Sequence, residues 1–426
     1  MGHVVNQERE YRLLQQRYDR SVTGAPYSPT FIRILKLLFS PEEAELARQV
    51  PGRPTSLSKL SRKLDMPEED LEGVLTELAQ RGVVLDLEHH GKRYYMLPPV
   101  VVGFFEFTLM RARDDFPTAE LSRLFTEYMD ENDRFAHSLF QGETQVGRSL
   151  VREEALPEGD HTEILDWERS SALIKSASSL SVGLCPCRHK AGHMGTACDA
   201  PVRVCLSLNA GADAMIRNGI SDPITTAEAM DILETCKEAG LAQTGDNVQR
   251  DVSFLCNCCK CCCGLIKGIR TFGIPHAVVS SNWIMAVDAA ECTGCGACVK
   301  ACPVDAINVV EQTAGDPKSK RAVLDESICM GCGVCYSACK SGAISMKSRP
   351  QRVLTPETVF DRVVRMAIER NKLADLLFET PDRLTHRALG RVLSVLEKSP
   401  PWKAAMAVKP LRSAFLNAML KGAAKA

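Results

Sequence analysis

A repeated cysteine pattern near the centre of the C-terminal half most constrains the fold of this chain. The run ECTGCGACVKACP spaces its cysteines as C-x2-C-x2-C-x3-C, and ICMGCGVCYSACK repeats that spacing 37 residues later. Glycines within each run let the backbone wrap closely, so that three thiolates of one loop can take three corners of an iron–sulfur cubane. The fourth cysteine begins a helix toward the other half, where we expect it to ligate the other cluster.

These two quartets resemble bacterial-type ferredoxins that carry two [4Fe-4S] clusters. The resemblance implies cluster I on Cys292, Cys295, Cys298 and Cys339, and cluster II on Cys329, Cys332, Cys335 and Cys302. Lys340 stands where those ferredoxins have a proline, a residue that starts a helix and binds no metal. A structural zinc site is the alternative for any single C-x2-C pair, but two symmetric quartets disfavour it. Paired clusters would let an electron enter at one and leave at the other.

A second group of cysteines lies within residues 181–285. LCPCRHKAGHMGTACDAPVRVCLSL spaces four of them as C-x-C-x10-C-x6-C, and CNCCKCCCG adds six. The candidate ligands are Cys185, Cys187, Cys198, Cys205, Cys256, Cys258, Cys259, Cys261, Cys262 and Cys263. Soft thiolates at this density select Fe–S clusters, zinc or Cu(I). Since six neighbouring thiols cannot converge on one cubane, we predict one or two additional Fe–S clusters here, with a zinc site and a role without metal as alternatives.

Other residues of this region have simpler interpretations. His189 and His193 lie between the first cysteines, but loop histidines are more often polar than ligating. Arg188 and Lys190 are candidates for hydrogen bonds that raise the potential of a cluster. Cys236 lies in a segment predicted to be helical, where a single cysteine behaves as a small buried apolar residue.

The N-terminal residues 1–103 are expected to form a winged-helix-like domain. Helices are predicted over FIRILKLLF, SLSKLSRKLDM and PEEDLEGVLTELAQRG, the last bounded by Pro67 and Gly82. VVLDLEHHGKRYYML then alternates about a turn, as a β-hairpin does. The third helix carries five acidic residues against Arg81 alone, a face that phosphate would repel. We therefore expect a structural or protein-docking module and no nucleic-acid binding.

The predicted fold class is a multidomain α+β chain with five parts. After the winged-helix-like domain come a helical connector over 104–180, a helical cysteine-rich middle over 181–285, a dicluster ferredoxin fold over 286–350 and a helical basic tail over 351–426. In the tail, one amphipathic helix is predicted over TPETVFDRVVRMAIERNKLADLLF (residues 355–378), with Thr355 as its cap and Pro356 at its first position. The last 46 residues hold nine Lys or Arg against two acidic residues, which would suit a packed helix with a solvated basic face, an acidic redox partner or peripheral contact with a membrane.

The order of these parts is similar to that of a family of large bacterial iron–sulfur proteins of anaerobic metabolism. The similarity rests on CPCRHKAGHMGTACDAPVRVCLSLN, FLCNCCKCCCG and the two cysteine quartets. It implies a role in electron transfer without a settled substrate.

Composition excludes several other classes of protein. A net charge of −1 gives no general affinity for nucleic acid. No apolar run approaches the roughly 18 residues of a transmembrane span, and the polar N-terminus lacks a secretion signal. Nineteen cysteines in such a chain indicate metal binding in the reducing cytoplasm more than disulfides.

We therefore expect a cytoplasmic multicluster iron–sulfur protein that relays single electrons to or from a protein redox partner, a carrier more than a stand-alone enzyme. One alternative is an Fe–S reductase with a catalytic cluster in 185–263, which an incomplete ligand set would favour. The other is a redox-sensing winged-helix regulator, which the acidic third helix disfavours. No glycine-rich nucleotide motif follows a convincing strand, and the sequence identifies no catalytic residue.

Overall fold

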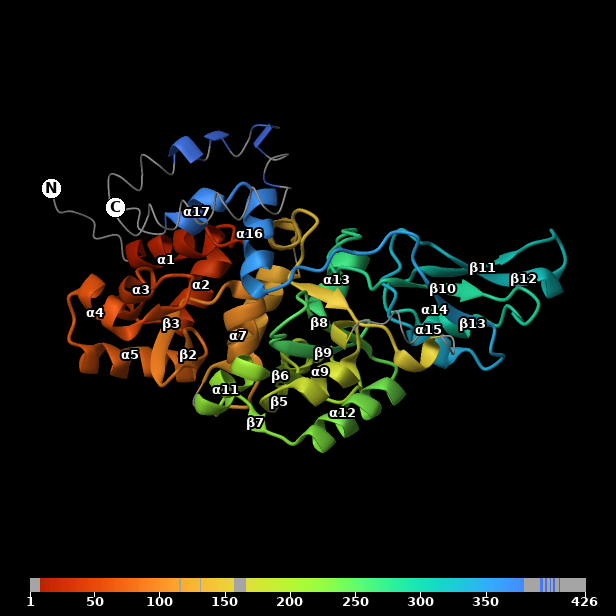
Figure 1. Cartoon of the computed structure of the whole chain (residues 1–426), viewed down its shortest axis with the longest axis horizontal. Helices are drawn as coiled ribbons and strands as arrows, with labels where there is room; N and C mark the ends of the chain where they lie inside the picture. Colours follow the sequence, from red (N-terminus) through yellow and green to blue (C-terminus); the bar gives the residue numbers. More distant parts are fainter. Residues whose placement is uncertain are drawn as a thin grey trace. The chain divides into compact units, whose positions relative to one another are not determined.

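The computed structural model describes residues 8–114, 116–130, 132–156 and 166–378, with 391–393, 395, 396, 399, 401, 402 and 406. The chain divides into two compact units, whose elements are labelled in Figure 1. Unit 1 takes the described parts of Met1–Thr108, Asp115–Thr144 and Phe360–Ala426, and unit 2 takes those of Leu109–Asp114 and Gln145–Val359. Helices and strands occur in both units, in agreement with the predicted α+β class. The five-part division stays a prediction.

Unit 1 surrounds a small sheet with helices. The helices are α1 (Arg9–Asp19), α2 (Pro29–Leu38), α3 (Pro41–Ala47), α4 (Leu57–Leu64), α5 (Glu68–Arg81), α6 (Phe105–Leu109), α7 (Thr118–Met129), α8 (Arg134–Leu139), α16 (Val359–Glu369) and α17 (Leu373–Leu377). The strands β1 (Thr55–Ser56), β2 (Leu85–His89) and β3 (Lys92–Met96) pair in the order β1-β3-β2. Buried aromatic rings form its core, with Phe31 stacked on Tyr128 at 4.7 Å and Phe104 packed on Tyr18 at 5.0 Å between centroids.

The predicted elements of the N-terminal region are confirmed. Pro67 and Gly82 bound α5, and Gly82 has the left-handed φ of 85° that commonly ends a helix. Strands β2 and β3 pair as an antiparallel hairpin that closes at the pair His89 and Lys92.

The single C-terminal helix predicted over residues 355–378 is wrong at its start and in its continuity. Helix α16 begins at Val359, and the chain breaks at Asn371, whose φ is 55°, before α17. The carbonyl of Thr355 instead accepts the side chain of Gln249 at 2.8 Å, and the carbonyls of the next two residues accept backbone N–H groups of Gln249 and Arg250. These long-range bonds hold the segment outside the helix. The basic tail beyond residue 380 lies almost wholly outside the described residues.

Unit 2 is built on a six-stranded antiparallel sheet in the order β4-β8-β9-β6-β5-β7. Its strands are β4 (Gly147–Ser149), β5 (Leu180–Leu184), β6 (Arg203–Leu208), β7 (Asp222–Pro223), β8 (Ala242–Asp246) and β9 (Phe254–Cys258). The accompanying helices are α9 (Ser170–Ser176), α10 (Pro186–His193), α11 (Asn209–Arg217), α12 (Thr226–Glu238) and α13 (Gly264–Arg270). A buried core joins residues of α9 and α12 to β5, β6 and β9.

The cysteine-rich middle is therefore not the helical segment that the sequence predicted. Strands β5, β6 and β9 are short runs, LSVGL, RVCLSL and FLCNC, with nearly every residue buried or half-buried. A strand buried on both faces lacks the polar–apolar alternation that identifies an exposed strand. Two of these runs, RVCLSL and FLCNC, also contain cysteines, and in the sequence such cysteines suggested metal ligands on loops in place of strands.

The second part of unit 2 has an internal twofold repeat. Strand β10 (Trp283–Val287) pairs with β13 (Ile344–Ser348), and β11 (Ile307–Glu311) pairs with β12 (Lys320–Leu324). Each half supplies a cysteine-rich loop and a five-residue helix, α14 (Ala297–Ala301) or α15 (Val334–Ala338). None of the helices within the described ranges has the length and apolar character that crossing a membrane requires.

Candidate metal centres

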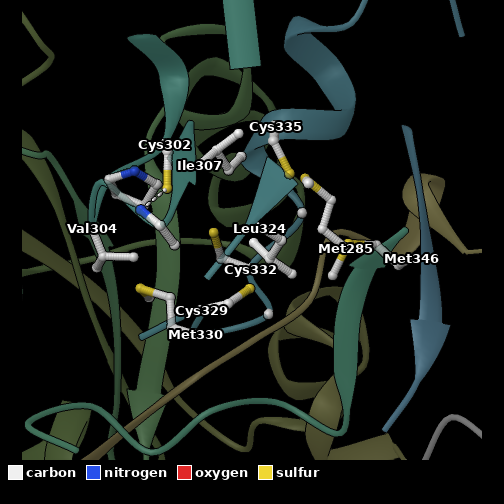
Figure 2. A pocket seen from close by; sticks show the side chains of 14 residues that line it. Met285, Cys302, Val304, Ile307, Leu324, Cys329, Met330, Cys332, Cys335 and Met346 are labelled. Atoms are coloured by element: carbon white, nitrogen blue, oxygen red, sulfur yellow. Dashed lines mark hydrogen bonds between the residues drawn. The ribbon is translucent and has the colours of Figure 1, made fainter. Parts of the chain in front are cut away.

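Four cysteines line a cavity between the two halves of this repeat (Figure 2). Cys302, at the C-terminal end of α14, lies across the cavity from Cys329, Cys332 and Cys335 of the second cysteine run. The remaining walls are almost wholly apolar and come from Met285, Pro303, Val304, Ala306, Ile307, Leu324, Met330, Gly331, Gly333 and Met346. Four soft donors in an apolar enclosure are the donor set that a [4Fe-4S] cluster uses.

Burial dominates the electrostatics of this cavity. Cys302, Cys332 and Cys335 are each less than a tenth exposed. Burial raises the pKa of Cys332 to about 12 and also raises the pKa of Cys335. The backbone N–H of Ala306 donates to Cys302 Sγ at 3.2 Å, a contact that would stabilise a thiolate. Binding of iron would therefore have to displace these thiol protons.

The first cysteine run is more open to solvent. Cys298 is buried, Cys292 is half-buried and Cys295 is exposed. Burial raises the pKa of Cys298, and the neighbouring Cys292 and Cys295 thiols add to that effect. Cys339 ends α15 as Cys302 ends α14, and its Sγ lies 3.6 Å from the hydroxyl of Ser341.

Glycines allow both cysteine loops to pack directly on backbone. Gly331 has a φ of 69°, and a Cβ placed there would lie 2.2 Å from the carbonyl oxygen of Trp283. Gly294 has a φ of 68° and would bring a Cβ to 2.6 Å from the carbonyl of Lys320. Any larger residue would push the loop, and the thiols on either side of it, away from these strands.

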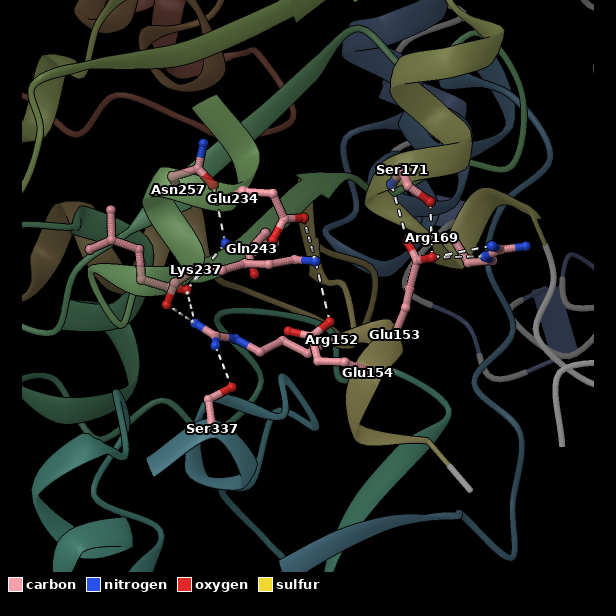
Figure 3. Close-up of polar contacts among 11 residues, drawn as sticks. Arg152, Glu153, Glu154, Arg169, Ser171, Glu234, Lys237, Gln243, Asn257 and Ser337 are labelled. Carbon is pink, nitrogen blue, oxygen red and sulfur yellow. Dashed lines mark hydrogen bonds and ion pairs between the residues drawn. The ribbon is translucent and has the colours of Figure 1, made fainter. Parts of the chain in front are cut away.

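A buried cation lies beside the cavity, and sequence reasoning missed it (Figure 3). The Arg152 guanidinium donates to Ser337 Oγ at 2.5 Å and to the carbonyls of Lys237 and Leu241 at 2.9 and 3.2 Å. Its backbone N–H donates to the carbonyl of Cys332 at 3.1 Å. Burial lowers the pKa of Arg152, whereas nearby acidic groups, Cys332 among them, act in the opposite direction. Because 185 residues separate Arg152 from Ser337, no local sequence signal could have paired them.

This part of the chain also matches the model of a known domain family. Residues 291–357 match the family model of the 4Fe-4S dicluster domain. The matched range contains both cysteine quartets, and we call it the dicluster domain below. No curated protein and no solved structure matches the chain. The domain and the abundance of cysteines support Fe–S cluster binding and a role in electron transfer.

The ten candidate cysteine ligands upstream of the dicluster domain fall into two groups. The first, which we call the compact quartet, comprises Cys198, Cys259, Cys261 and Cys262. All four Sγ atoms lie within 4.8 Å of one another, and no other group of metal-ligating side chains among the described residues has this form. Cys198 comes from the loop between α10 and β6, and the other three come from the loop between β9 and α13. The pattern CNCCKCCCG could not show which of its thiols would converge.

The second group, the six-thiol group, comprises Cys185, Cys187, Cys205, Cys256, Cys258 and Cys263. Cys263 Sγ lies 3.3 Å from Cys258 Sγ. The thiol of Cys187, in the first turn of α10, is hydrogen-bonded to the thiols of Cys185 and Cys263. These two hydrogen bonds lower the pKa of Cys187. The same contacts raise the pKa of Cys185 and of Cys263.

Neighbouring strands close this group. The thiols of Cys205 on β6 and Cys256 on β9 are hydrogen-bonded to each other. They lie side by side because the register of the two antiparallel strands pairs Leu206 with Leu255. The bond with Cys205, together with burial, raises the pKa of Cys256, and the charges of Cys258 and Cys185 act in the same direction. The six thiols therefore form a connected set on β6 and β9 and at the N-terminal ends of α10 and α13.

Arg188 lies between the compact quartet and the six-thiol group. It is 1 % exposed, and its Nη1 donates to the carbonyl of Asn257 at 3.0 Å. Its Nε and Nη2 have no oxygen or nitrogen partner. Burial lowers the pKa of Arg188, but the thiols of Cys185 and Cys259 raise it more, so the net shift is upward. A buried guanidinium in this setting favours an anionic neighbour.

The other candidates occupy separate positions. His189 Nδ1 donates to the carbonyl of Leu109 at 2.8 Å, and His193 Nε2 lies 3.2 Å from His189 Nε2. Cys236 is fully buried in α12, where burial raises its pKa to about 12, and it belongs to neither thiol group. Lys190 is buried at the end of α10.

Ion pairs join the cysteine loop to the dicluster domain. Lys260, between Cys259 and Cys261, lies 2.5 Å from a carboxylate oxygen of Asp305, three residues after Cys302. Arg270 Nε donates to the other oxygen of the same carboxylate at 2.6 Å. These ion pairs thus hold the loop that carries Cys259, Cys261 and Cys262 next to the segment that carries Cys302.

Proposed function

We propose that this protein relays single electrons between an electron donor and a protein redox partner. Two [4Fe-4S] clusters of the dicluster domain would carry the electrons, with a further Fe–S centre at the six-thiol group. The observation that carries this proposal is the apolar cavity in which Cys302 faces Cys329, Cys332 and Cys335. When bound, each cluster supplies one-electron transfer at a potential that the surrounding protein sets.

The arrangement of the two halves supports specific ligand sets. Cluster II would take the four cysteines of the cavity, Cys302, Cys329, Cys332 and Cys335. Cys339 ends α15 in the position in which Cys302 ends α14, and this symmetry of the repeat supports Cys339 as a ligand of cluster I. Cluster I would then be bound by Cys292, Cys295, Cys298 and Cys339.

Differences in burial suggest how electrons would pass. Cys295 is exposed, so cluster I would lie near the surface, where a partner protein can approach. Cluster II would lie in the interior, with Arg152 fixed beside it by Ser337 and by the backbone of α12. A buried positive charge stabilises the reduced, more negative state of a cluster and raises its potential.

The six-thiol group supports a third centre. Six thiols exceed the four that one cubane needs, and Arg188 supplies a buried positive charge beside them. This surplus does not favour the reductase alternative, which requires an iron atom that lacks a protein thiolate.

The winged-helix assignment of residues 1–103 also remains our proposal, with a role in protein docking. Glu68, Glu69 and Asp70 are exposed in the first turn of α5, the helix that would face DNA. Such a face would repel phosphate, so the regulator alternative gains no support. A cytoplasmic location, a role in anaerobic metabolism and contact of the basic tail with a partner or membrane stay predictions.

Reversible one-electron reduction of the full chain tests the proposed relay. Anaerobic photoreduction should bleach the visible cluster absorbance, and added oxidised cytochrome should restore it while being reduced in turn. A variant with Cys332→Ser and Cys335→Ser should transfer fewer electrons per chain, whereas Cys236→Ala should match the wild type. Absorbance that does not bleach, or that bleaches without passing electrons on, would contradict the proposal.

A further inference from the structure

The spacing of the compact quartet differs from that of cubane ligands. Four thiolates around one tetrahedral ion are separated by about 3.8 Å, given metal–sulfur bonds of about 2.3 Å. Thiolates that bind different irons of a cubane are separated by about 6 Å, because each lies beyond its own iron. All Sγ distances in the compact quartet are within 4.8 Å, whereas neither dicluster quartet is that compact among the described residues.

We propose that the compact quartet of Cys198, Cys259, Cys261 and Cys262 binds a single Zn²⁺ ion, separate from the Fe–S clusters. Zinc has no redox chemistry in proteins, and its structural sites are closed tetrahedra of thiolate and imidazole ligands. The ion would therefore hold structure and take no part in the electron path. This site goes beyond the proposed relay, which requires none of these four residues.

The local backbone supports a mononuclear site. The N–H of Cys262 donates to Cys259 Sγ at 3.4 Å, a bond that turns the loop sharply and stabilises a thiolate. Cys259 and Cys262 are buried against Ala191, Val204 and Leu241, so one side of the site is closed by apolar side chains.

Arg188 gives a second, independent indication of an anionic centre. Four thiolates and one Zn²⁺ ion carry a net charge of about −2. The Arg188 side chain bonds to Cys259, and its Nε and Nη2 have no oxygen or nitrogen partner although the residue is 1 % exposed. A buried cation of this kind would offset the charge of the site.

The proposed ion would fix the scaffold of the six-thiol group. It would tie the loop between α10 and β6 to the loop between β9 and α13. Cys205 follows the first loop on β6, Cys263 is the last residue of the second loop, and both belong to the six-thiol group. Loss of the ion would therefore loosen the third centre without removing any of its ligands.

Metal analysis of the full chain, isolated anaerobically, tests the proposal. We expect about one zinc per chain in the wild type. A variant with Cys198→Ser and Cys261→Ser should lose that zinc and keep the iron of the dicluster domain, and Cys236→Ala should keep both metals. Loss of about four irons with no change in zinc would overturn the proposal in favour of a cubane, and one lost iron would overturn the assignment to zinc.

X-ray absorption at the zinc edge of the wild type keeps the test independent of variant folding. The result expected is a shell of four sulfurs at about 2.3 Å. Zinc bound mainly to nitrogen or oxygen, or no stoichiometric zinc, would overturn the proposal. Iron content and reversible reduction are read separately on the same sample, so failure of the zinc site can be distinguished from failure of the relay.

Discussion

The dicluster domain and the compact quartet use the same side chain in two geometries. In the dicluster domain, thiols from the two halves face one another across an apolar cavity. In the compact quartet, four sulfurs lie within 4.8 Å, with three of them on one loop. The cavity and the compact quartet each have four cysteines. If the proposed metals are bound, the spacing of the thiols, set by the elements that carry them, decides between a cluster and a single ion.

The largest expected effect separates the two geometries by their metals. Changing Cys332→Ser together with Cys335→Ser should remove about four irons per chain, because cluster II loses two ligands. Zinc should stay at about one per chain. Elemental analysis and EPR of the reduced protein measure both outcomes. Retained iron with lost zinc would reverse the assignment of the two sites.

A backbone substitution should destabilise the cysteine loop of cluster II. Gly331→Ala introduces a Cβ 2.2 Å from the Trp283 carbonyl at a φ of 69°. We expect a loss of about 3 kcal/mol or more, from the clash and the left-handed backbone together. Gly342→Ala is the matched control, since its φ is 73° and nothing lies within 4 Å of the added atom, so about 1 kcal/mol is expected there. The measurement is the temperature at which the cluster absorbance disappears in Gly331→Ala and in Gly342→Ala. Equal shifts in the two variants would show that the close contact with the Trp283 carbonyl does not contribute to the loss of stability.

The positive charge of Arg152 should change the midpoint potential of cluster II and leave that of cluster I unchanged. Arg152→Met removes the positive charge beside Cys332, so the midpoint potential of cluster II should fall by on the order of 50 mV. In Arg152→Lys the midpoint potential of cluster II should fall less, because lysine keeps the positive charge and loses only the fixed hydrogen-bond geometry of the guanidinium. Redox titration followed by EPR resolves the clusters, with Lys318→Met, an exposed residue of the same domain, as the control. Equal shifts in both clusters would contradict a local effect.

The smallest effect concerns the ion pairs that fasten the cysteine loop to the dicluster domain. Partial burial raises the pKa of Asp305, but bonds from Lys260 and Arg270 lower it more, so its pKa lies below the ordinary value. The stabilisation is therefore present above about pH 4 and is lost as the pH falls through the folded-state pKa. Since the carboxylate is about half exposed, Asp305→Asn should cost at most about 1 kcal/mol at pH 7.

Thermal unfolding of the wild type and of Asp305→Asn at several pH values checks this. The difference between them should shrink below about pH 4. A difference that grows in acid would contradict the assignment of the shift.

Local signals predicted some of this structure well. Pro67 and Gly82 bound α5, as the sequence predicted. The cysteine spacing likewise predicted the dicluster domain, because all the signals lie within a few residues of one another.

Features that depend on contacts between residues far apart in the sequence could not be predicted from local sequence signals. Strands β6 and β9 are buried on both faces and show no alternation. The division of the ten upstream thiols depends on the pairing of these two strands, which places Cys205 beside Cys256. The carbonyl of Thr355 is held by Gln249, 106 residues away, and Arg152 reaches Ser337 across a longer separation. No periodicity or capping rule contains such information.

Iron, zinc and acid-labile sulfide per chain in anaerobically isolated full-length protein test the central claim most directly. The wild type should contain twelve or more irons and about one zinc, because three Fe–S centres and one zinc site are proposed. A variant with Cys187→Ser and Cys256→Ser should fall to about eight irons and keep its zinc, because only the six-thiol group has lost ligands. About eight irons in both samples would contradict the account, since all iron would then belong to the dicluster domain.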